Sequence, residues 1–187
     1  YANSPRYEHV GGRWSWRCRA GYKPSDAAPH VREEAFPEAW DEVPAGLLHL
    51  LVESACEEVH QFAAKALRAN DAACNGLPAE AVALLLARPY LVTVRLAFDL
   101  AKDRWDSNKP NLVLAAAAAN CLLQSARTEA HRWMEAARLA FAQDHDALVS
   151  VIASPYADTR EAARSIAQSA VLSDVESAAL VRALLDK

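Results

Sequence analysis

The feature that most constrains the fold of this chain is an apolar helix face that recurs four times. It is read by counting five, eight, nine and twelve residues onward from four helix-breaking positions. The breaks are Ser54, Pro89, Ser125 and Ser154, and the positions counted from them are Val59, Phe62, Ala63 and Ala66; Val94, Ala97, Phe98 and Ala101; Ala130, Trp133, Met134 and Ala137; and Thr159, Ala162, Ala163 and Ile166. This spacing places the side chains on one face of an α-helix. One helix pair cannot by itself cover the apolar stripe that this face forms. The pattern therefore favours helix pairs that stack on one another.

Helical spacing of apolar residues continues from Pro44 to the end of the chain and leaves no room for a sheet. Proline, serine, aspartate and asparagine mark the starts and stops. Pro44, Pro78 and Pro110 are expected at first-turn positions, where a missing N–H costs nothing. The predicted helices cover residues 44–53, 57–69, 78–87, 90–105, 110–123, 128–142, 144–153, 159–170 and 173–186.

Alanine supports this interpretation, since 41 of the 187 residues are alanine. Alanine has the highest helix propensity, and its small side chain lets helices approach closely. The unbroken run from Ala115 to Ala119 predicts an inner helix that is packed on both sides. Only 7% of the residues are aromatic and five are glycine, which argues against a turn-rich β sandwich.

The four breaks are 35, 36 and 29 residues apart. This layout of short helix pairs with one repeated face resembles the HEAT-like (armadillo-type) α-helical repeat family over residues 44–187. The resemblance implies an all-α superhelix, a HEAT-like solenoid of about four helix pairs plus a closing helix. The short last spacing departs from the family's period, and the Asp/Arg signature between the helices of a HEAT unit is not uniformly present. A non-repetitive helical bundle is the alternative fold.

Residues 1–43 are predicted to form an irregular N-terminal arm, because proline and glycine interrupt them too often for a stable helix. Within this arm the sequence Arg13–Arg19 alternates polar and apolar residues, as a short strand does. Alternatively, it is an extended segment whose two tryptophan rings cap an apolar face. A short helix is also expected around residues 33–40. The chain does not begin with methionine, so we expect a piece of a larger polypeptide, with the arm leading to an upstream domain and residues 44–187 forming the repeat domain.

Charge is distributed unevenly along the chain. Residues 1–32 contain six basic and two acidic side chains, whereas residues 33–71 contain nine acidic and two basic ones. We expect these two segments to pair within the molecule. The net charge of −4 and the pI near 5.9 argue against a dedicated nucleic-acid binder, which usually carries a strongly basic surface.

No motif for catalysis or for a cofactor is recognisable in the sequence. Glu57 and His60 have the spacing of a carboxylate-bridged metal site, but the second copy that such a site needs is missing. There is no CxxC pair, no nucleophile elbow and no phosphate loop. We therefore expect no cofactor, no metal and no enzymatic activity. Four cysteines without such spacing, no signal peptide and no long apolar stretch predict a cytoplasmic protein without a membrane partner.

Two sets of residues are candidates for binding. Six residues after each break stand His60, Arg95, His131 and Arg160, which in a regular solenoid would form a column on the concave face. Such a column suits an acidic partner, and its two histidines would make binding sensitive to pH. Alternatively, the i,i+4 neighbours Asp99 and Glu135 neutralise part of the column.

The second set lies in the arm and combines basic and aromatic side chains suited to nucleic acid. It consists of Arg13, Trp14, Trp16, Arg17 and Arg19. The sequence thus predicts a non-catalytic interaction or scaffold module that binds a protein partner, or an adjacent domain of the same chain, on its concave face. The alternative is a nucleic-acid-binding module that uses the arm together with the basic column.

Overall fold

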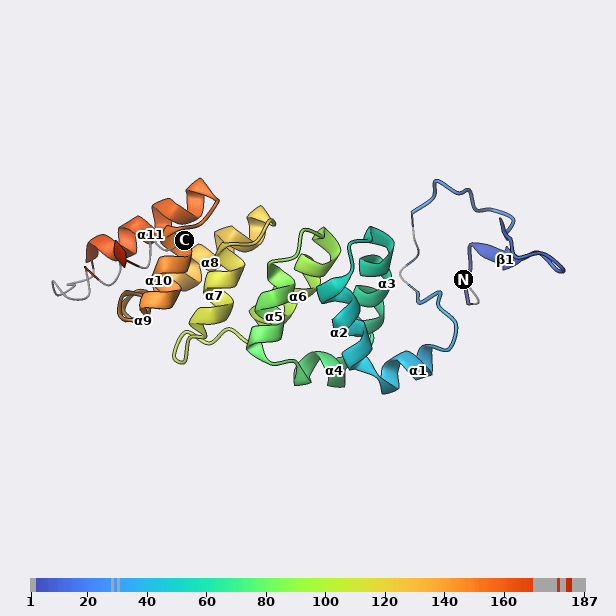
Figure 1. The fold of residues 1–187 in the computed structure, drawn as a ribbon, viewed down its shortest axis with the longest axis horizontal. Helices are drawn as coiled ribbons and strands as arrows, with labels where there is room; N and C mark the ends of the chain where they lie inside the picture. The colour runs from blue at the N-terminus through green and yellow to red at the C-terminus, as the bar shows by residue number, and fades with distance from the viewer. Residues whose placement is uncertain (1–2, 28, 30, 170–177, 179–180, 183–187) are drawn as a thin grey trace. The chain divides into compact units, whose positions relative to one another are not determined.

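The computed structural model describes residues 3–27, 29, 31–169, 178 and 181–182 of the chain. Within them the fold is all-α apart from one short hairpin (Figure 1). The helices are α1 Pro37–Glu42, α2 Pro44–Glu53, α3 Glu57–Arg68, α4 Asp71–Gly76, α5 Ala79–Leu86, α6 Leu91–Asp103, α7 Leu112–Ala119, α8 Gln124–Ala136, α9 Arg138–Gln143, α10 His145–Ile152 and α11 Ala157–Ser169. None of these helices is long and apolar enough to cross a membrane.

The chain packs as two compact units, Tyr1–Gly76 and Leu77–Lys187, called unit 1 and unit 2 below. This division reflects packing, whereas the predicted boundary after residue 43 marks a change from irregular to helical sequence. Each unit is described by itself.

Unit 1 begins with a β-hairpin whose strands are β1, Tyr7–His9, and β2, Trp16–Cys18. The strands are antiparallel, and Glu8 lies opposite Arg17. Gly12 in the connecting loop has φ of +74°, a left-handed conformation that glycine adopts without steric cost. The predicted strand is thus confirmed over Trp16–Cys18, while its partner strand β1 was not predicted.

The helices of unit 1 follow the hairpin and its irregular continuation. Helices α2 and α3 pack against each other, and α1 packs against both. Leu47, Leu51 and Leu67 are fully buried between these helices. The predicted helix at residues 33–40 begins later, at Pro37. Helix α4 was not predicted; Asn70 stabilises its start by accepting a hydrogen bond from the Ala73 N–H at 3.0 Å.

The described part of unit 2 contains three helix pairs, α5–α6, α7–α8 and α10–α11, with α9 between the last two. Helices α5, α7 and α10 contact one another in chain order, and α8 contacts α11. The pairs therefore stack within this unit (Figure 1). Helix α7 holds the alanine run, and all of its alanines except the half-buried Ala117 are buried. The prediction of an inner helix is confirmed.

Burial of the predicted apolar face is also confirmed. Twelve of its sixteen positions are buried, and the other four, Val59, Phe62, Phe98 and Ala162, are half-buried. Trp133 is the largest side chain on this face. Its ring stacks on Trp105, with centroids 5.0 Å apart, and on Phe98, with centroids 5.8 Å apart. Aromatic stacking thus joins α8 to α6 and to the turn that follows α6.

Several predicted helix ends were wrong by a few residues. Pro44 does begin α2, but Pro78 and Pro110 precede the helices they were expected to start. The asparagine between Pro110 and α7, Asn111, caps α7 by accepting from the Leu114 N–H.

The predicted helices 110–123 and 128–142 are instead α7, α8 and α9, because the chain leaves the helical conformation at Asn120 and at Ala137. The closing helix predicted over residues 173–186 lies outside the described residues, apart from residues 178, 181 and 182.

Candidate functional site

The first candidate site is the hairpin of residues 6–19, which we call the Arg/Trp hairpin. Trp14 lies in its loop with a relative exposure of 105%, and Trp16 on β2 is 42% exposed. Arg13, Arg17 and Arg19 are exposed as well. The structure therefore brings together all five residues predicted for nucleic-acid contact. It contradicts the alternative that both tryptophan rings cap an apolar face, because Trp14 is fully exposed.

Two of these arginines also hold the hairpin in shape. Arg17 pairs with Glu8 across the strands, with Nε 2.5 Å from Oε1, and Arg19 donates from Nε to the carbonyl oxygen of Tyr7 at 3.1 Å. The Trp16 ring packs edge-on against His9, with centroids 5.5 Å apart. Trp14 is therefore presented on a hairpin with several cross-strand contacts.

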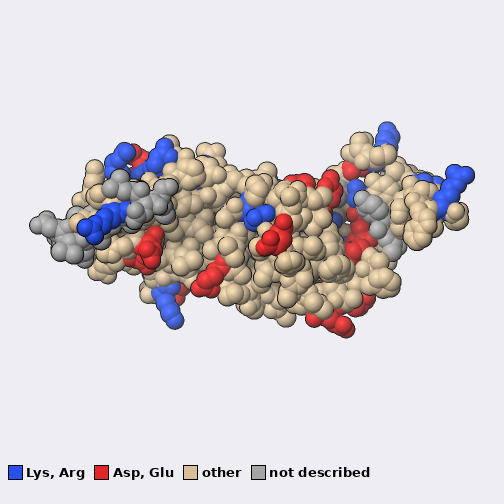
Figure 2. Space-filling view, in the orientation of Figure 1, with Lys and Arg blue, Asp and Glu red and all other residues tan. Residues whose placement is uncertain are grey.

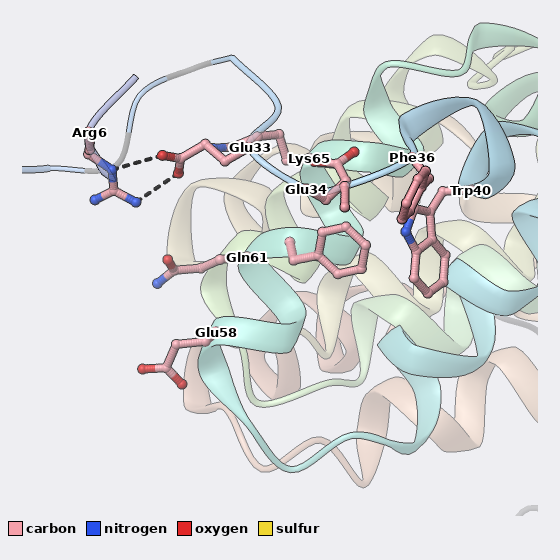
Figure 3. Close-up of a pocket in the computed structure, with 10 residues that line it drawn as sticks. Arg6, Glu33, Glu34, Phe36, Trp40, Glu58, Gln61 and Lys65 are labelled. Carbon is pink, nitrogen blue, oxygen red and sulfur yellow. Dashed lines mark hydrogen bonds and ion pairs between the residues drawn. The ribbon is translucent and has the colours of Figure 1, made fainter. Parts of the chain in front are cut away.

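The second candidate site is a pocket of about 570 Å³ in unit 1, which we call the aromatic pocket (Figure 3). Phe36, Trp40 and Phe62 provide its aromatic walls, and Trp40 packs edge-on against Phe62 with centroids 5.1 Å apart. The remaining lining residues are Arg6, Glu33, Glu34, Ala35, Glu58, Gln61 and Lys65. Its walls come from three separate parts of the sequence, which is why no local motif predicted it.

A charged pair closes one side of the pocket. Arg6 donates from Nε to Glu33 Oε1 at 3.0 Å and from Nη2 to Oε2 at 2.7 Å, and the Ser4 hydroxyl also donates to Glu33. Burial alone would raise the pKa of Glu33, but these hydrogen bonds and the charges of Arg6 and Lys65 outweigh it and lower the pKa. Glu33 is thus held as a carboxylate.

Two further cations fasten the irregular segment. Arg32 pairs with Glu34 and, from Nη1, with Asp41 Oδ1 at 2.7 Å. Burial alone would lower the pKa of Arg32, but the hydrogen bonds and charges of its two carboxylate partners outweigh it and raise the pKa. Lys65 Nζ donates to the carbonyl oxygen of Pro29 at 2.6 Å. For Arg6 and Arg32, this confirms the expectation that residues 1–32 pair with residues 33–71.

Glu58 differs from the other carboxylates that line the pocket, because it accepts a hydrogen bond from a thiol and not from a cation. It is exposed and accepts a hydrogen bond from the Cys56 thiol at 3.1 Å, which lowers the pKa of Glu58. In Figure 3 its side chain and that of Gln61 project from α3 to the outside of the pocket. Glu58 therefore offers a carboxylate at the rim.

Phe36 lies at this pocket in a strained backbone conformation. Its φ of 56° and ψ of 55° are left-handed, which is unusual for a bulky residue, and its side chain is 77% exposed. Strained residues of this kind cluster at functional sites. The ring is a hydrophobic surface presented to solvent beside Trp40 (Figure 3).

The predicted column must be corrected at His60. This side chain is fully buried, with Nε2 3.0 Å from the carbonyl oxygen of Ser54. The reason is that the buried face of α3 runs through His60, Ala63, Ala64 and Leu67, and so includes the position expected on the surface. His60 cannot contact a partner in this conformation.

The other members of the column lie in unit 2. Arg95 and Arg160 are exposed, and Arg160 donates from Nη1 to the carbonyl oxygen of Ser154 at 2.8 Å. His131 is half-buried, with Nε2 3.0 Å from Thr159 Oγ1. Burial and the charge of Arg127 lower the pKa of His131 against the opposing effect of Asp158.

Sequence reasoning missed Arg127, which organises the polar contacts around His131. Its side chain is nearly buried and pairs from Nε with Asp158 Oδ2 at 3.0 Å. Its Nη1 donates to the carbonyl oxygens of Cys121 and Leu122, and its guanidinium lies 4.0 Å from the ring centroid of Tyr156. These contacts tie α8 to the start of α11 and to the loop after α7, which is a structural role.

Within the described part of the chain, no three His, Cys, Asp or Glu side chains form a group that could hold a metal ion. Comparison of the sequence with protein-family models and with curated proteins, and of the structure with solved structures, found no match.

Proposed function

We propose that this protein is a non-catalytic interaction module and that it binds a protein partner, or an adjacent domain of a larger chain, through the Arg/Trp hairpin. The observation that carries this proposal is the complete exposure of Trp14 between arginines. Tryptophan and arginine are the residue types that contribute most to binding at protein interfaces. The predicted column supports binding less well, because His60 is buried and His131 contacts Thr159.

The helical part of the molecule is proposed as the scaffold. We infer that its pairs belong to a HEAT-like solenoid, and the support is the repeated buried face together with the stacking of α5, α7 and α10 in unit 2. Such stacks provide extended surfaces on which partners bind.

The partner that suits the hairpin best is an acidic and apolar segment of a protein. Arginine can pair with carboxylates while the indole of Trp14 buries apolar surface. A nucleic acid suits the molecule less well, because unit 1 also contains the nine acidic side chains of residues 33–71, which repel a polyanion. Nucleic acid remains the second candidate, since alternating arginine and tryptophan can also stack on unpaired bases.

A binding assay separates the two candidates. Fluorescence anisotropy would follow a labelled peptide of alternating glutamate and leucine, and separately a labelled oligothymidylate, at about 50 and 200 mM salt. We expect the peptide to bind and Trp14→Ala to weaken it at least about tenfold. Leu139→Ala is the matched control, because Leu139 is an exposed apolar residue of unit 2.

The two proposals predict different outcomes in this assay. Oligothymidylate binding that falls steeply with salt and requires Trp14 would favour the nucleic-acid candidate. If neither probe binds, or if Trp14→Ala has no effect on either, the hairpin is not the binding element and the proposal is wrong.

A further inference from the structure

We propose that the Arg/Trp hairpin of one copy of this chain binds the aromatic pocket of a second copy, with Trp14 among the pocket's rings and Arg13 at the Glu58 carboxylate. This inference rests on the proposed function, because it names a protein partner for the same hairpin. It assigns a ligand to the aromatic pocket, which the proposed function leaves without a role.

The pocket has the size and the chemistry for an aromatic side chain. Its volume of about 570 Å³ lies within the range of pockets that bind organic ligands. Phe36, Trp40 and Phe62 offer ring faces and edges against which an indole can pack. Phe36 is 77% exposed in the free chain, so an occupant would cover apolar surface that is now in water.

The charges around the pocket favour an occupant that is basic as well as aromatic. Within the pocket wall the Glu33 and Glu34 carboxylates already have arginine partners, and Lys65 is bound to the Pro29 carbonyl. The Glu58 carboxylate at the rim accepts a hydrogen bond from the Cys56 thiol and not from an arginine. An incoming guanidinium can therefore pair with Glu58 while an adjacent ring enters the pocket.

The hairpin of this chain has that combination in adjacent residues. Arg13 precedes Trp14, both are exposed, and Trp14 is fully accessible even though the pocket belongs to the same unit. Arg6, at the base of the hairpin, lines its own copy's pocket, but Trp14 does not enter it, so a second copy can fill it. Figure 2 shows basic side chains on the N-terminal arm and acidic ones on the helices beside it, so each copy carries both complementary surfaces.

The contact joins Arg13 and Trp14 of one copy to the aromatic pocket of another copy; made in one direction only it is heterologous, and made reciprocally by two copies it is isologous. Two copies satisfy it by exchanging hairpins in both directions, and otherwise further copies add in a chain. In either case the average mass must rise with protein concentration.

The first test measures the average mass of the full chain by analytical ultracentrifugation over a range of protein concentrations. A thiol reductant is present throughout, because Cys56 is exposed and free and could form disulfides between copies. We expect concentration-dependent association that Trp14→Ala and Glu58→Lys each weaken at least about tenfold. Leu139→Ala, on unit 2, is expected to associate like the unaltered chain. All three substitutions are at exposed positions, and circular dichroism checks that each variant is folded.

The decisive test mixes the two defective variants. Trp14→Ala retains an intact pocket and Glu58→Lys retains an intact hairpin, so their mixture should associate more strongly than either variant does alone. A chain that stays monomeric at the highest attainable concentration would overturn the inference. So would association that Trp14→Ala leaves intact, or a mixture that fails to associate.

The outcome is separable from that of the proposed function. The acidic peptide used above binds the hairpin and not the pocket, so its affinity should be unchanged by Glu58→Lys. Peptide binding without self-association refutes only this inference. If the unaltered chain shows neither peptide binding nor self-association, the proposed role of the hairpin is refuted as well.

Discussion

The two compact units hold their chain segments in different ways. In unit 1 the irregular segment before α1 is fastened by charged groups, through Arg6 to Glu33, Arg32 to Glu34 and Asp41, and Lys65 to backbone carbonyls. In unit 2 the helices pack through their buried apolar faces. The ion pair of Arg127 with Asp158 adds a polar contact between α8 and α11. A segment with few apolar residues cannot be held by burial, so it depends on charge. Unit 1 should therefore respond to pH, and unit 2 to changes of side-chain volume.

The largest effect is expected from Trp133→Ala in unit 2. Removing a buried ring that stacks on Trp105 and Phe98 should lower the free energy of unfolding by about 3–5 kcal/mol. Urea denaturation followed by circular dichroism measures it. Trp14→Ala is the matched control, because the same substitution at a fully exposed tryptophan should change the free energy of unfolding by less than about 0.5 kcal/mol. Equal effects at the two sites would contradict burial as the source of stability in unit 2.

A smaller effect is expected from Arg127→Met, which keeps an apolar side chain of similar length. The carbonyl oxygens of Cys121 and Leu122 lose a donor and Asp158 loses its partner, which should cost about 1.5–3 kcal/mol. The control is Arg132→Met, whose exposed pair with Glu129 is worth at most about 0.5 kcal/mol. The same denaturation assay compares the two. A loss no greater than that of Arg132→Met would show that the Arg127 contacts add nothing to unit 2.

Acid should release the N-terminal segment of unit 1 while the apolar faces of unit 2 stay packed. The pKa of Glu33 is lower in the folded protein than in the unfolded chain, so its pairing with Arg6 stabilises fully above the ordinary carboxyl pKa. That contribution, about 1–2 kcal/mol, is lost as the pH falls through the folded pKa. The Arg19 amide donates a hydrogen bond to the Arg6 carbonyl oxygen at 2.8 Å, so its hydrogen exchange reports whether the segment around Arg6 is released. The measured exchange rate at each pH is divided by the intrinsic rate at that pH.

Glu33→Gln is the companion variant for this measurement. The glutamine side chain cannot titrate, so protection of the Arg19 amide should be lower at neutral pH and should fall less with acid than in the unaltered chain, in which both Glu33 and the Glu8 partner of Arg17 are protonated. Asp158 in unit 2 also has a lowered pKa beside Arg127 and loses its stabilising effect in the same direction. Protection in α7 should nevertheless persist, because its alanines are held by packing. Loss of protection in both units at the same pH would remove the distinction between them.

The smallest effect, and a stabilising one, is expected at Phe36. Asparagine tolerates the left-handed conformation better than a bulky residue does, so Phe36→Asn should raise the stability of unit 1 by about 0.5–1 kcal/mol. Hydrogen exchange of unit 1 amides measures it. Destabilisation would show that the ring of Phe36 contributes more by packing than its backbone costs.

The periodic spacing of apolar residues predicted the features of the fold that depend on neighbouring residues along the chain. The spacing after Ser54, Pro89, Ser125 and Ser154 gave the buried faces, and the exposed Arg13–Arg19 segment was singled out by its alternation. Helix ends were less predictable where alanine residues continue across the end of a helix, as at Ala137, because alanine favours the helix and does not mark its end as glycine or proline does.

The remaining features depend on distant partners. Arg127 resembles any polar surface residue in the sequence, and its burial follows from Asp158, 31 residues later. His60 is buried because the core-facing side of α3 includes it together with Ala63, Ala64 and Leu67. The aromatic pocket combines residues 6, 33–40 and 58–65, and no spacing along the chain connects them. Sequence reasoning thus found the hairpin and missed the pocket that we propose it binds.

Helix α7 sets the distance between its neighbours with methyl groups. Ala115, Ala118 and Ala119 are fully buried, and α5 and α10 both contact this helix. Because protein interiors are close-packed, a larger side chain there is expected to push the two neighbouring helix backbones apart. Substitutions in this short segment should therefore change the spacing between α5 and α10, and α7 should tolerate enlargement less than an exposed loop does.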